Sequence, residues 1–151
     1  MGRRVSTTNN TKLDSGIRTI SFSHDVFDKE SGQVKEKVFS LFRINPADVK
    51  TGERAMESAD YFENLKSELE TIEDVGQLQK DIEDKISYIL GYESSDEIFG
   101  EVSALTILPD GSMFVEHVVG KIMEVVEPAI EQRQKAMAKR AESYTAKYKK
   151  K

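Results

Sequence analysis

Residues 113–130 read MFVEHVVGKIMEVVEPAI and carry the longest hydrophobic pattern in the chain. Their apolar side chains recur every three or four residues, the spacing that places them on one face of an α-helix. The segment PDGS at residues 109–112 breaks the chain just before this pattern, and Pro128 lies inside it, where a proline kinks or splits a helix. The pattern therefore predicts a long C-terminal helix, and the rest of the fold must supply its packing partners.

Beyond Ile130 the large apolar residues stop. Residues 132–151 still favour a helix through their Ala, Lys, Gln and Arg. Their apolar stripe is too weak to be buried alone and consists of Ala136, Met137, Ala141, Tyr144 and Tyr148. We expect residues 132–151 to form a basic tail, helical or disordered, that becomes ordered against another surface.

Helical patterns also precede this segment. Asn45 and Pro46 are typical of an N-cap and a first helical residue, and an amphipathic run continues from Glu53 to about Thr71. A further helix is predicted up to Leu90, with Gly91 as its C-terminal cap. A short helical turn is predicted over residues 96–99. We therefore predict that residues 45–131 form an acidic helical domain.

The N-terminal part of the chain has a different pattern. Residues 17–27 and 34–44 alternate apolar and polar side chains, are rich in β-branched and aromatic residues, and flank the turn sequence DKESG. Residues 17–44 are therefore predicted to form a β-hairpin, and the polar residues 1–16 a disordered arm. The predicted fold class is mainly α (α+β), an N-terminal hairpin followed by an all-helical domain with a long C-terminal helix.

Composition narrows the function. The 151 residues include no Cys and only two His, which excludes disulfides and thiolate sites and disfavours a metal site or a catalytic triad. The glycines occur singly and form no glycine-rich phosphate-binding loop. Neighbouring acidic residues such as Glu83 and Asp84 are typical of a solvent-exposed surface rather than of a catalytic acid–base pair. We expect no enzyme and no cofactor. With no apolar run long enough for a membrane span and no signal peptide, we expect a soluble protein without membrane contact.

The net charge of −5 is divided unevenly. Residues 1–52 carry +3, residues 53–131 carry −15 and residues 132–151 carry +7. An acidic body with a basic tail suits salt-sensitive contacts with partners or with further copies of the chain, so a homo-oligomer is one hypothesis.

The tail is the segment with the clearest physical basis for binding. Its Lys and Arg could contact nucleic-acid phosphates while its Tyr residues stack on bases, or the same residues could meet an acidic protein surface. The −15 block disfavours nucleic acid because it repels phosphate at any extended contact. We therefore favour a protein partner, and a tail that only aids solubility remains an alternative.

Several short stretches between residues 40 and 151 carry a resemblance. They are the junction RINPAD at 43–48, the pair Tyr61-Phe62 in an acidic helix, the loop from Gly91 to Glu101, and SYTAKY at 143–148. In this order they resemble the small tail-assembly chaperones of long-tailed, siphovirus-like phages and prophages. None of these stretches is a catalytic signature, and the resemblance does not cover the N-terminal arm and hairpin.

The resemblance implies a non-enzymatic protein of the host cell cytoplasm. It implies binding to the long, helical tape-measure protein, or another phage tail protein, during tail assembly. An amphipathic helix could dock on a stripe that includes Met56, or on one that includes Phe114 and Val118, although both stripes also suit the protein's own core. The predicted partner-binding residues are Phe62, Leu65, Arg133, Lys139, Arg140, Tyr144, Lys147 and Tyr148. A virion structural protein, such as a head–tail connector or tail component, is the alternative.

Overall fold

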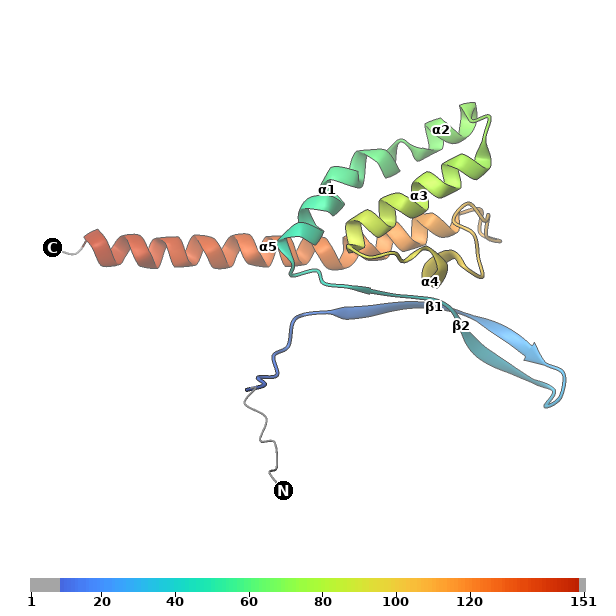
Figure 1. The fold of residues 1–151 in the computed structure, drawn as a ribbon, viewed down its shortest axis with the longest axis horizontal. Helices are drawn as coiled ribbons and strands as arrows, with labels where there is room; N and C mark the ends of the chain where they lie inside the picture. The colour runs from blue at the N-terminus through green and yellow to red at the C-terminus, as the bar shows by residue number, and fades with distance from the viewer. Residues whose placement is uncertain (1–8, 150–151) are drawn as a thin grey trace, which may run out of the picture.

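The structure, a computed structural model, describes residues 9–149, with side chains placed as far as Thr145. Two antiparallel strands come first and helices follow, as Figure 1 shows. The elements are β1 (Arg18–Asp28), β2 (Gln33–Ile44), α1 (Val49–Glu63), α2 (Leu65–Thr71), α3 (Val75–Leu90), α4 (Ser95–Phe99) and α5 (Phe114–Lys149). This architecture confirms the predicted fold class. The predicted arm lies partly outside the described residues, and residues 9–17 form neither a helix nor a strand.

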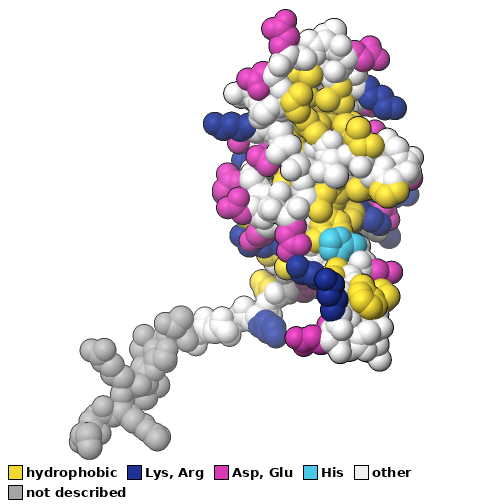
Figure 2. Space-filling model, turned by 90° about the vertical axis from the view of Figure 1, so that its right-hand side faces the viewer, with side chains coloured by type: hydrophobic (Ala, Val, Ile, Leu, Met, Phe, Trp, Pro, Cys, Tyr) yellow, Lys and Arg dark blue, Asp and Glu magenta, His cyan; other side chains and the backbone are white. Residues whose placement is uncertain are grey.

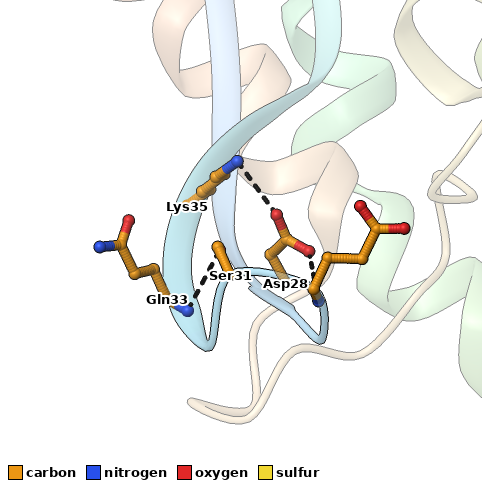
Figure 3. A network of polar contacts seen from close by, with 5 residues as sticks. Asp28, Ser31, Gln33 and Lys35 are labelled. Carbon is orange, nitrogen blue, oxygen red and sulfur yellow. Dashed lines mark hydrogen bonds and ion pairs between the residues drawn. The ribbon is translucent and has the colours of Figure 1, made fainter.

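The hairpin turn is closed by the side chains that its sequence supplies, as Figure 3 shows. Asp28 accepts a hydrogen bond from the Glu30 N–H and forms an ion pair with Lys35, whose Nζ lies 3.0 Å from Oδ2. Gly32 adopts a φ of +70°, which favours glycine, and its N–H donates to the Asp28 carbonyl over 2.8 Å. The polar turn thus fixes how the two strands pair.

A β-bulge in β2 changes which of its side chains face the helices. Phe22 pairs with Ser40 and Ser23 with Val38, so Phe39 is the extra residue of a β-bulge. Phe39 packs against Phe114 of α5, with 5.4 Å between the ring centroids. Beyond the bulge, Val38 is turned to the outer face and is 52% exposed.

Phe114 joins the hairpin to the helices. Its ring is also 5.3 Å from Phe22 in β1 and 5.7 Å from Phe99 in α4, both in edge-to-face arrangements. The core continues from this cluster along α3 and α5. Its buried residues are Phe42, Ile44, Ala55, Leu65, Leu78, Ile82, Ile86, Ile89, Ile98, Phe99, Ala104, Phe114, Val115, Val118, Ile122 and Val126.

The first helix begins three residues later than the sequence predicts. Asp48, not Asn45, is the N-cap, and its side chain accepts from the Lys50 N–H. Asn45 instead accepts from the Ala47 N–H and donates to the Ser15 carbonyl, so it shapes the turn before the helix. The predicted run from Glu53 to Thr71 is also interrupted, because α1 ends at Glu63 and α2 begins at Leu65.

The ends of α3 and α4 agree with the prediction. Gly91 caps α3 with a φ of +81°, and its N–H donates to the Ser87 carbonyl. The short α4 follows and ends at Gly100.

The last helix continues through Pro128 and extends well beyond the body of the molecule (Figure 1). Proline removes a backbone donor from a helix, but Pro128 and Glu124, four residues earlier, lie on the exposed side of α5, where water can supply the missing donor. α5 therefore has a packed half, up to Ile130, and an exposed half that follows.

Candidate functional site

An apolar groove lies between α1 and α5, and we call it the α1–α5 groove. Its volume is about 320 Å³, the lower end of the range of ligand sites. The residues that line it are Met56, Ala59, Phe62, Glu63, Leu65, Val115, Glu116, Val119, Gly120, Met123 and Glu127.

Small residues keep the groove open. Ala59 lies on the α1 side, and a Cβ placed on Gly120 of α5 would meet no atom within 4 Å. At one end the helices close together, where a Cβ on Gly52 would come within 3.3 Å of the Ile130 side chain. From that closed end, α1 and α5 leave a trough along α5 from Glu127 back to Val115. The trough is about 18 Å long at 1.5 Å per residue.

The rim of the groove is acidic. Glu63 lies on the α1 side, and Glu116 and Glu127 lie on the α5 side. Among the side chains that the structure describes, up to Thr145, none of the three forms an ion pair, although Glu116 accepts a hydrogen bond from the Met113 N–H at the start of α5. The groove therefore combines an apolar floor with negative charge that a cationic ligand would neutralise.

Two of the predicted partner-binding residues line this groove. Phe62 contacts Tyr61 edge to face, with 5.2 Å between the ring centroids, and forms part of the α1 wall. Leu65 is only 3% exposed, so it belongs to the core as well as to the groove. Met56 and Met123 add flexible thioether side chains, which adapt to differently shaped ligands.

The remaining predicted residues lie on the far half of α5, away from the groove. Lys139, Arg140 and Tyr144 are exposed there. Arg133 is partly buried, and its guanidinium donates to the Ala47 carbonyl over 3.3 Å. Lys147 and Tyr148 lie within α5, but their side chains are outside the described part of the structure.

The groove includes residues that sequence reasoning did not select. Val115, Val119 and Met123 face it, whereas the stripe of Phe114, Val118, Ile122 and Val126, considered as a docking surface, is 0–1% exposed and forms the core. The amphipathic pattern located both sets on α5, but only the position of α1 decides which set is covered.

Ser112, just before α5, contacts His117 in the first turn of α5. The serine hydroxyl does not donate its hydrogen bond to the histidine, as a nucleophile would to its general base. The His117 Nε2 lies 2.8 Å from the Ser112 Oγ. The Ser112 hydroxyl donates to the Asp110 carboxylate, and this bond together with that from the Ser112 N–H lowers the pKa of Asp110. Since the serine proton is directed to Asp110, this loop fits a role in starting α5.

The described acidic residues of α3 and α4 do not form a metal-binding site. Partial burial raises the pKa of Glu83, as do the nearby Asp84, Asp96 and Glu93 carboxylates. Within the described residues, no three His, Cys, Asp or Glu side chains are grouped as a metal site would require. No helix in this part of the chain has the length and apolar character needed to cross a membrane.

The hairpin offers a second apolar surface. Pairing in register places four apolar residues on the face directed away from the helices, and all are about half exposed or more: Phe27, Val34, Val38 and Leu41. Figure 2 views the molecule from the end at which the hairpin turn lies, and hydrophobic side chains there form a broken band between acidic and basic ones.

Comparison with known proteins gives no relative for this chain. No family model, no curated protein and no solved structure matches it.

Proposed function

We propose that this protein is a non-enzymatic phage tail-assembly chaperone that binds a helical segment of the tape-measure protein in the α1–α5 groove. The observation that carries the proposal is the groove itself, an apolar trough with an acidic rim. Peptide helices bind such grooves through apolar side chains at positions i, i+3 or i+4, and i+7. The order of short sequence stretches described above supports the phage assignment.

The chemistry of the groove defines the client helix. Met56, Phe62 and Met123 accept large apolar side chains, and the three rim carboxylates favour Lys or Arg on the flanks of the client's apolar stripe. A client helix of this kind would aggregate through its apolar stripe when free. Covering that stripe while exposing acidic helices to solvent would keep the complex soluble.

Co-expression tests the proposal. The protein is produced together with the long helical protein encoded by a neighbouring gene, and we measure how much of that protein stays soluble and is recovered in a pull-down. Met56→Glu adds a charge to the groove at a side chain that is 52% exposed, so folding should persist while client recovery falls at least about tenfold. Val75→Glu, at a 54% exposed site on α3 that does not line the groove, is the matched control.

The proposal fails if the helical protein stays soluble alone and does not bind. Equal loss of recovery in Met56→Glu and Val75→Glu would show that the α1–α5 groove is not the client site.

A virion structural protein is the second candidate, and the hairpin is the observation that favours it. The exposed apolar face at Phe27, Val34, Val38 and Leu41 belongs to a two-stranded sheet with two free edges, which suits strand addition between subunits of a ring. Purified particles distinguish the two candidates, because a chaperone is absent from them and a structural protein is present in a fixed copy number.

A further inference from the structure

The hairpin has one face that no other described element covers. Successive residues of a strand point to opposite faces, and Ile20, Phe22 and Phe42 point to the face packed on the core. The opposite face, which we call the outer face, consists of Thr19, Ser21, Ser23, Asp25 and Phe27 of β1 and Val34, Glu36, Val38, Leu41 and Arg43 of β2. Each of these residues is exposed. Figure 1 shows the helices on one side of the hairpin, so the outer face is directed away from them.

The side chains of the outer face follow a regular order along the strands. Paired residues form rows, which from the start of β1 to the turn are Thr19 with Arg43, Ser21 with Leu41, Ser23 with Val38, Asp25 with Glu36, and Phe27 with Val34. Ile17, one residue before β1 and 56% exposed, continues the alternation beyond the first row. The order is therefore apolar, cationic, apolar, apolar, anionic, apolar. Reversed and laid on itself, this order sets apolar rows against apolar rows and the cation against the anions.

The anionic row has no counter-charge within the described side chains. Asp25 and Glu36 lie opposite each other across the strands, where like charges destabilise a sheet. The Ser23 hydroxyl donates to Glu36 over 2.5 Å, but neither carboxylate forms an ion pair with a side chain that the structure describes. Arg43, the cation on the same face of the strands, lies at the opposite end of the hairpin, over the Tyr92 ring. A cation for the anionic row therefore has to come from another molecule.

We propose that two copies of this chain pair through their outer faces, with the hairpins stacked face to face and their strands antiparallel. A two-fold axis across the strands, between the Leu41 row and the Val38 row, places Leu41 over Val38 of the second copy. The same axis places Arg43 over Glu36 of the second copy, which supplies the missing counter-charge. Because β2 lies over β2 and β1 over β1, every contact occurs twice and the pair is closed.

The arrangement keeps the rest of each copy apart. Sheets stacked in this way lie about 10 Å apart, and the helices, which pack on the other face of each hairpin, are directed outward. At both ends of the interface Ile17 meets Phe27 of the second copy, so apolar contacts flank the ion pairs.

The interface is small, and the α1–α5 groove lies outside it. Eleven residues of β1 at about 3.3 Å each, in a sheet about 10 Å wide, give a face below the standard interface size, so we expect a dissociation constant on the order of 10–100 µM. No hairpin residue lines the groove, so each copy in the pair keeps its groove open. On the proposed function, the pair offers two sites to one long helical client, and a dimer holds such a client more tightly than a monomer does.

Sedimentation equilibrium of the full-length protein, without a client, tests the pairing. The wild type should change from monomer to dimer between about 5 and about 500 µM. Val38→Asp places a charge against the second copy's Leu41 and should weaken dimerisation at least about tenfold. Val26→Asp is the matched control, because Val26 is also exposed, at 40%, but lies on the other face of the hairpin. It should weaken dimerisation less than about threefold.

A charge exchange tests the predicted register. Arg43→Glu places a third carboxylate against Asp25 and Glu36 of the second copy, and Glu36→Arg places two arginines against each other. Each variant, with folding checked by circular dichroism, should weaken dimerisation at least about tenfold. The double variant restores opposite charges across the interface and should recover part of the loss.

A wild type that stays monomeric up to about 500 µM overturns the pairing. Loss of client recovery in Val38→Asp but not in Val26→Asp would then assign the outer face to the client. Species larger than a dimer also overturn the pairing, because a two-fold axis closes after two copies. Equal weakening by Val38→Asp and Val26→Asp, or no recovery in the double variant, refutes the predicted contacts. The proposed function fails separately, since a dimer that recovers no client overturns only the chaperone assignment.

Discussion

The backbone N–H of Arg43 donates a hydrogen bond of 2.9 Å to the Tyr92 hydroxyl, and the Arg43 guanidinium carbon lies 3.9 Å from the centroid of the same ring. This double contact joins the end of β2 to the loop after α3. This contact and the aromatic cluster around Phe114 both attach the hairpin to the helical part of the chain. An isolated two-stranded hairpin is marginal in water, so these contacts set its position.

Tyr92→Phe tests the polar half of this contact. The ring remains, but the Arg43 N–H loses its acceptor, and we expect a loss of about 1 kcal/mol in the free energy of unfolding. Amide exchange in the last residues of β2 should also become faster. Tyr88→Phe removes an exposed hydrogen bond to Glu57 and serves as the control, with an expected change within about 0.5 kcal/mol. Equal changes in the two variants would contradict a structural role for the Tyr92 hydroxyl.

Phe114→Leu tests the aromatic cluster. Phe114 is 1% exposed and contacts three other rings, so the smaller side chain should lower the free energy of unfolding by about 1–3 kcal/mol in urea titrations. Phe27→Leu makes the same change at a residue that is 61% exposed, and it should alter stability by less than about 0.5 kcal/mol. The prediction is wrong if the two substitutions have the same effect.

The hairpin turn should loosen on acidification. The ion pair with Lys35, and then the hydrogen bond from the Glu30 N–H, hold the pKa of Asp28 below its usual range. A carboxylate with a lowered pKa in the folded state stabilises that state above its unfolded pKa of about 3.9, and the contribution is lost as the pH falls through the lowered folded pKa. The protection of the Glu30 and Gly32 amides, measured as the exchange rate relative to the intrinsic rate at the same pH, should therefore fall below about pH 4. Asp28→Asn should remove this pH dependence, and an unchanged profile in that variant would refute the assignment.

Local signals in the sequence predicted most of the fold. The hairpin follows from alternation around a turn that contains Gly32, and the end of α3 follows from Gly91, because both glycines adopt the positive φ that such turns require. The predicted start of α1 was wrong because Asn45 and Asp48 are both residues that favour the N-cap position. The hydrogen bond from Asn45 to Ser15, thirty residues earlier, holds Asn45 in the preceding turn and leaves Asp48 as the N-cap. The bulge at Phe39 likewise depends on packing against Phe114.

The groove could be predicted only in part. Phe62 and Leu65 were selected from the apolar stripe of α1 and α2, but the opposite wall depends on the side of α5 that α1 leaves uncovered. That choice follows from the close approach of Gly52 to Ile130, a contact between residues 78 positions apart that no local pattern encodes. The sequence predicted a basic tail that is helical or disordered, and the structure shows it as a helix continuous with the packed half of α5 as far as Lys149.

Gly120→Met separates folding from binding in the α1–α5 groove. A Cβ at Gly120 meets no atom within 4 Å, and a glycine inside a helix costs roughly 0.5–1 kcal/mol relative to alanine, so this variant should unfold no more easily than the wild type. Its side chain, however, extends into the space that a client helix would occupy. Recovery of the client should therefore fall at least about tenfold. Gly76→Met on α3, exposed and away from the groove, should leave recovery unchanged. If Gly120→Met folds normally and binds the client like the wild type, the groove is not the client site.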